Sequence, residues 1–77
     1  SADMRLPRKD GKSGGITFSD TQYDQVATIA MLEAFRAQPL FKRILFNDPD
    51  LIKKRLCQKA PGHDNHFHFE IKPPPPI

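Results

Sequence analysis

The sequence predicts an α+β fold in which a small antiparallel sheet carries two helices. Three short segments have the pattern of strands, and two others combine helix start signals with apolar residues at helical spacing. The chain has 77 residues, a length that suits one small domain. We expect the domain to cover residues 1–72 and a proline-rich tail to cover residues 73–77, because consecutive prolines cannot extend a sheet.

The strand predictions depend on alternating side chains. Residues 1–6 alternate weakly between apolar and polar, and residues 41–46 end in three apolar residues before Asn47. Residues 65–72 alternate most regularly, which gives this strand one apolar and one polar face. The apolar face consists of Phe67, Phe69 and Ile71, and the polar face of His66, His68 and Glu70.

The first helix is predicted to begin at Ser19, because Gln22 three residues later completes a capping box. We expect it to end near residue 37 or 38, since Pro39 disfavours helical geometry in the residue before it. Its expected apolar face comprises Tyr23, Val26, Ala27, Ala30 and Ala34. The apolar surface is widened by Ile29, Met31, Leu32 and Phe35, so we expect the helix to be covered on more than one side.

The second helix is predicted by Asp48 followed by Pro49, a side-chain cap and a proline in the first turn. We expect it to run to about Gln58. The side chains expected to be buried are Leu51, Ile52 and Leu56. Residues 60–64 then form a turn before the last strand.

Composition narrows the possible functions only slightly. The net charge of +3 favours anionic surroundings such as a cell wall, a nucleic acid or an acidic lipid, but an ordinary solvated surface has the same charge. The chain has no apolar run of the roughly 18 residues that span a membrane. Cys57 is the only cysteine, so no internal disulfide can form.

The strongest functional signal is the pattern H-x-x-H-x-H formed by His63, His66 and His68. Residues two apart on a strand share a face, with Cα atoms about 6.6 Å apart. Two imidazoles there can bind one metal ion together, or one can bind while the other takes part in proton transfer. A solvated strand face has the same spacing. We favour a functional cleft because the opposite face of this strand is apolar.

Asp3 is a second candidate. It stands between Ala2 and Met4, where a carboxylate needs a cationic partner. Taken alone, it is better explained as an exposed aspartate near a chain end.

These segments together resemble a known family. The residues that carry the resemblance are S-A-D-M-R-L-P at 1–7, I-L-F-N at 44–47 and H-D-N-H-F-H-F at 63–69. They are similar to the C-terminal half of the penicillin-insensitive murein endopeptidases, zinc enzymes of the lysostaphin, D-Ala-D-Ala peptidase and hedgehog-like fold. The resemblance implies a fragment of such a domain, periplasmic or secreted, that cleaves the peptide cross-links of peptidoglycan.

The resemblance also implies residue roles. Asp3 and His68 would be zinc ligands, His66 would act on the attacking water or the developing oxyanion, and His63 would support it. A further histidine ligand is expected seven residues before Asp3, a position upstream of Ser1. We therefore expect either that the chain is a fragment of a longer protein or that its site is degenerate, and that it binds Zn²⁺ weakly.

Three other functions stay open. The same fold with a degenerate zinc site could be a non-catalytic module that binds cell-wall peptide or a protein. The prolines at 73–76 could dock into an aromatic groove, although such a run is typical of a linker. Nucleic-acid binding is the weakest alternative, because the basic run at 53–55 contains none of the aromatic residues that stack on bases, and we predict no nucleic-acid partner.

Overall fold

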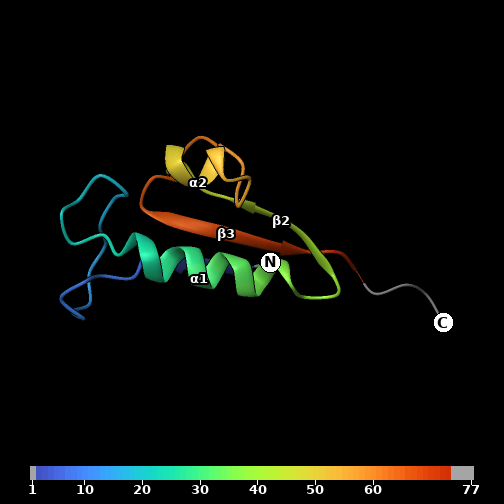
Figure 1. Cartoon of the computed structure of the whole chain (residues 1–77), viewed down its shortest axis with the longest axis horizontal. Helices are drawn as coiled ribbons and strands as arrows, with labels where there is room; N and C mark the ends of the chain where they lie inside the picture. Colours follow the sequence, from blue (N-terminus) through green and yellow to red (C-terminus); the bar gives the residue numbers. More distant parts are fainter. Residues whose placement is uncertain (1, 74–77) are drawn as a thin grey trace.

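The computed structural model describes residues 2–73, which form a three-stranded antiparallel sheet and two helices. In chain order the elements are β1 (Ala2–Arg5), α1 (Gln25–Arg36), β2 (Phe41–Leu45), α2 (Pro49–Lys53) and β3 (His66–Ile71). The sheet order is β1-β3-β2, so the last strand of the chain is the central one (Figure 1). The predicted α+β class, with a small antiparallel sheet and two helices, is confirmed.

One face of the sheet is covered by α1, which runs beside β3 (Figure 1). The ring of Phe35 stacks on Phe69 with centroids 4.7 Å apart and lies 6.0 Å from Phe67. The apolar face of β3 is therefore the packed one, as its alternation predicted. The polar face of β3 points away from α1, where its side chains are available for a site.

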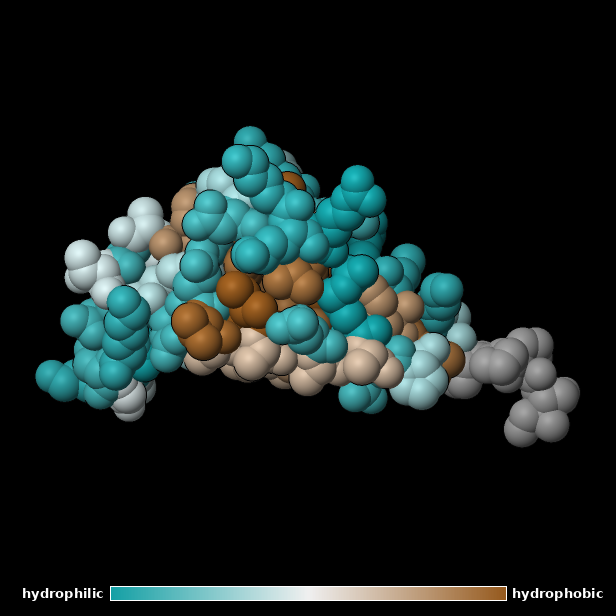
Figure 2. Space-filling model, viewed as in Figure 1, coloured by the Kyte–Doolittle hydropathy of each residue, from teal (hydrophilic) through white to brown (hydrophobic). Residues whose placement is uncertain are grey.

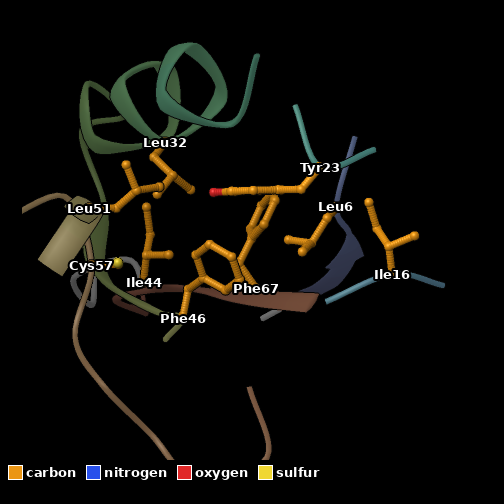
Figure 3. Close-up of a cluster of buried hydrophobic side chains, with 9 residues drawn as sticks. All are labelled: Leu6, Ile16, Tyr23, Leu32, Ile44, Phe46, Leu51, Cys57 and Phe67. Atoms are coloured by element: carbon orange, nitrogen blue, oxygen red, sulfur yellow. The ribbon is translucent and has the colours of Figure 1, made fainter. Parts of the chain in front are cut away.

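The core lies between α1, the sheet and the segment around α2 (Figure 3). Its buried members are Leu6, Ile16, Tyr23, Leu32, Ile44, Phe46, Leu51, Cys57 and Phe67. Phe46 and Phe67, both 0% exposed, meet edge to face with centroids 6.3 Å apart. This pair links the end of β2 to β3, which fixes the strand that carries the histidines.

The predicted start of the first helix was wrong, because α1 begins at Gln25 and its cap is Asp24, not Ser19. The Asp24 side chain accepts a hydrogen bond from the Ala27 amide at 3.0 Å. The backbone before Asp24 is held in turns by the neighbouring loop: Lys9 N donates to Gln22 O at 2.7 Å, and Asp24 N donates to Pro7 O at 3.0 Å. These long-range bonds outweigh the local capping box.

The prediction of the buried face of this helix was only partly right: Tyr23, which precedes α1, is buried, and so is Leu32 of the wider apolar surface. Thr28 and Leu32 are its buried residues, whereas Val26 is 79% exposed and Ala30 and Ala34 are exposed. Residues four apart share a face and residues two apart lie on nearly opposite sides, so packing through Thr28 and Leu32 turns Val26 outward. In Figure 2 hydrophobic surface gathers in the middle of one face of the molecule, with hydrophilic surface around it.

The start of α2 at Asp48 and Pro49 is confirmed, but the helix ends at Lys53 rather than near Gln58. Arg55 adopts a positive φ of 60°, which breaks the helical path. The chain then runs beside β2: Gln58 N donates to Ile44 O, and Phe46 N donates to Gln58 O, both at 2.9 Å. Leu51 is buried as predicted, while Ile52 and Leu56 are half-buried.

Most of the predicted proline-rich tail, residues 74–77, lies outside the described residues, so the boundary between domain and tail stays a prediction. In the described part of the chain no helix is both long and apolar enough to cross a membrane.

Candidate functional site

The antiparallel register of β1 and β3 places Asp3 directly opposite His68. Oδ1 of Asp3 lies 2.5 Å from Nδ1 of His68, so the two residues that the resemblance implies as zinc ligands are in contact, although 65 positions separate them. This hydrogen bond from His68 is the main cause that lowers the pKa of the Asp3 carboxyl below its ordinary 3.8. At this distance a proton lies between the two atoms, because both are otherwise acceptors.

A second carboxylate lies against the other ring nitrogen of His68. Oε2 of Glu70 is 3.3 Å from Nε2 of His68 and 3.1 Å from Nε of Arg43. The hydrogen bond from Arg43 is the main cause that lowers the pKa of Glu70. A register shift between Phe41 and Arg43 in β2 inserts Lys42 as an extra residue, and its Nζ approaches Glu70 to 3.9 Å.

Sequence analysis missed the roles of Glu70 and Arg43. The alternation of β3 placed Glu70 on the histidine face, but nothing in the sequence indicated that Arg43 of β2 would lie opposite it. The position of Glu70 affects the chemistry of His68. A carboxylate beside the second nitrogen of a histidine orients the ring and makes it a better metal ligand.

His63 and His66 complete the cluster. The rings of His63 and His66 have centroids 4.7 Å apart, and those of His63 and His68 are 6.1 Å apart. Nδ1 of His63 lies 2.9 Å from the carbonyl oxygen of Pro61, which can only accept. In this contact Nδ1 of His63 is the donor, and Nε2 is the ring nitrogen that it leaves free. The structure thus brings together all four residues that were predicted for the site.

The turn that carries His63 is held by Asn47, the residue after Phe46. The Asn47 side chain donates to Ala60 O at 2.7 Å and to Asp64 Oδ1 at 2.6 Å, and it accepts from Ala60 N at 2.7 Å. Its backbone amide also donates to His63 O at 3.2 Å. The sequence motif contained Asn47, but only the structure reveals that it fixes the 60–64 turn over the sheet.

A pocket of about 290 Å³ opens beside these residues. Its lining residues are Asp3, Arg5, Gly15, Asn65 and His66. A small polar ligand next to the Asp3 carboxylate and the His66 ring could occupy this pocket.

The residues fit Zn²⁺ in part. Two ligands of a tetrahedral zinc lie about 3.3 Å apart. The donor atoms of Asp3 and His68 would therefore have to move apart by about 1 Å or a little less to admit the ion. The Asp3 side chain is 66% exposed and can make this movement. However, no group of three or more His, Cys, Asp and Glu side chains within residues 2–73 is arranged to hold a metal. The contact between Asp3 and His68 thus brings together two residues of the types that bind zinc, and not a complete set of ligands.

Comparisons of the chain with protein-family models, with curated proteins and with solved structures give no match. The resemblance to the murein endopeptidases accordingly stays a prediction.

Proposed function

We propose that this chain carries the metal-binding strand pair and the catalytic histidines of a zinc-dependent peptidase, of the murein endopeptidase type, that cleaves peptide cross-links of peptidoglycan. Such an enzyme would act in the periplasm or outside the cell. One observation carries the proposal: Asp3 Oδ1 and His68 Nδ1 lie 2.5 Å apart on adjacent strands. A carboxylate and an imidazole in contact are the donor types that catalytic zinc sites use.

The surroundings of this pair support the same chemistry. Glu70 lies at the second nitrogen of His68, as outer carboxylates do around metal-ligating histidines. The cluster also opens onto the pocket beside His66, so a substrate can reach it.

In this proposal Asp3 and His68 would hold the zinc ion, which would supply Lewis-acid chemistry: polarisation of a scissile carbonyl and a lowered pKa of a water molecule. His66 lines the pocket and stabilises the developing oxyanion or transfers a proton. The His63 ring lies 4.7 Å from the His66 ring and would support it. Asn47 keeps that ring in place through the 60–64 turn.

The affinity for zinc should be low. Complete structural zinc sites bind with about 10 to 16 kcal/mol, so two of four ligands should supply about half of that, a Kd between about 1 µM and about 0.2 mM. Turnover by this chain is then expected to be slow.

A second candidate is a non-catalytic module that binds cell-wall peptide or a protein through a degenerate zinc site. It is favoured by one specific observation, the lack of a three-ligand group among the described residues. In that case the Asp3–His68 pair would be a structural ion pair across β1 and β3.

A cleavage assay separates the two candidates. The chain would be incubated with cross-linked peptide dimers from peptidoglycan, with added Zn²⁺ or with a chelator, and the products measured by mass spectrometry. The peptidase proposal expects slow zinc-dependent cleavage that His68→Ala abolishes and Glu33→Gln, an exposed change on α1, leaves intact. Binding of the dimers without cleavage supports the module, and neither binding nor cleavage contradicts both.

A further inference from the structure

Arg5 occupies a distinct place in the site. It pairs with His66 in the β1–β3 register, two residues along from the Asp3–His68 pair. Side chains two apart on a strand share a face, so Arg5 lies on the same face of β1 as Asp3. It also lines the pocket of about 290 Å³ together with Asp3, Gly15, Asn65 and His66.

The charge of Arg5 is not balanced within the described chain. Arg8 is paired with Asp10 at 2.7 Å, and Arg43 with Glu70 at 3.1 Å. Over residues 2–73 no carboxylate comes within 4.0 Å of the Arg5 guanidinium. The one acidic residue of the pocket, Asp3, is bonded to His68.

The geometry points to a substrate-carboxylate site: we propose that Arg5 binds a carboxylate group of the peptide substrate in this pocket, so that the substrate class is an anionic peptide. The planar guanidinium matches a carboxylate with two parallel hydrogen bonds. The inference rests on the proposed peptidase function and adds the recognition of the substrate.

The spacing along β1 sets where that carboxylate lies. Residues two apart on a strand are separated by about 6.6 Å, which is the span of about two residues of an extended peptide. With the cleaved bond at the Asp3–His68 pair, the bound carboxylate belongs to a residue within two positions of that bond. A free chain terminus or an acidic side chain at that position supplies the same group.

A binding experiment on the metal-free chain tests the inference separately from catalysis. N-acetylalanine, which has a free carboxylate, and N-acetylalanine amide would be titrated into the ¹⁵N-labelled chain and followed by NMR. We expect the acid to shift the amide signals of Arg5 and Asn65 and the amide form to leave them unchanged. We expect Arg5→Met to weaken binding of the acid about tenfold and Arg5→Lys to weaken it less, because lysine keeps the charge but loses the two-bond geometry.

Lys9→Met is the matched control, since it removes the same charge from an exposed loop position. It should leave binding of the acid unchanged, and unchanged spectra elsewhere would confirm that each variant is folded. Equal binding of acid and amide, or equal losses in Arg5→Met and Lys9→Met, overturns the inference. Failure of zinc-dependent cleavage with carboxylate selectivity intact overturns the peptidase proposal and leaves the anion site standing.

Discussion

Asn47→Asp tests how the turn that carries His63 is held. The substitution keeps the shape of the side chain but replaces its two N–H donors by a carboxylate oxygen. That oxygen then faces Ala60 O and Asp64 Oδ1, which lie 2.7 and 2.6 Å from Nδ2 in the folded chain. Two contacts change from attractive to repulsive, while the bond from Ala60 N to Oδ1 can remain.

The magnitude follows from these contacts. A hydrogen bond contributes about 1 kcal/mol net, and a partner left unsatisfied in a partly buried site costs about 1 to 3 kcal/mol more. Asn47 and Ala60 are half-buried and Asp64 is exposed, so the lower part of that range applies. We expect Asn47→Asp to lower the free energy of unfolding by about 3 kcal/mol, a large share of the stability of a small domain.

Urea unfolding followed by circular dichroism measures this change, and NMR contacts between the rings of His63 and His66 report the position of the turn. The double variant Asn47→Asp with Asp64→Asn restores one donor–acceptor pair and should recover part of the loss. Gln38→Glu adds the same charge at an exposed loop position and serves as the control. A loss below about 1 kcal/mol, or unchanged ring contacts, would refute the reasoning.

Other predictions concern the core and the ionisable groups. Leu32→Ala should cost about 3 kcal/mol in chemical unfolding, because Leu32 is 0% exposed and a cavity remains; a loss under about 1 kcal/mol would show that α1 does not pack as described. Tyr23→Phe should cost about 1.5 kcal/mol in the same assay, since it removes the 2.7 Å hydrogen bond to buried Asp48, and no loss would contradict that bond. Burial raises the pKa of the Cys57 thiol to about 11, so alkylation at about pH 8 should be about a hundredfold slower than in urea, and equal rates would place Cys57 at the surface. The fold lowers the pKa of the Asp3 carboxyl, so the ionised carboxylate stabilises the fold above pH 3.8, and this stabilisation is lost as the pH falls through the lowered pKa. Asp3→Asn should flatten that part of an acid-unfolding curve. An unchanged curve would refute this prediction.

The parts of the fold that were predictable depend on short, regular patterns. The two-residue alternation of 65–72 identified β3 and both of its faces, because one face had to pack against the core. The cap formed by Asp48 and Pro49 marked the start of α2, since both signals act within one turn.

The errors arose where distant contacts decide the local structure. Ser19 and Gln22 form a plausible cap, yet bonds from the 7–9 loop hold that segment in turns and the cap passes to Asp24. The end of α2 depends on the positive φ of Arg55 and on the pairing of Gln58 with β2, which no local pattern indicates.

The residues of the candidate site also fall into two groups, those that the sequence indicated and those that only the tertiary structure reveals. The clustering of His63, His66 and His68 was visible in the sequence because they are neighbours on one segment. Asp3 was connected to them through the resemblance, and the strand register then placed it opposite His68. Glu70 and Asn47 act through partners on other elements, so their roles depend on the tertiary structure.

Whether Asp3 and His68 bind one ion together is tested most directly by titrating Zn²⁺ into the metal-free chain in a calorimeter. The expected result is one weakly bound zinc per chain, with binding lost in both Asp3→Asn and His68→Ala and kept in Glu33→Gln. Zinc binding that survives both site substitutions, or no binding in the unaltered chain, would contradict a shared metal site between β1 and β3.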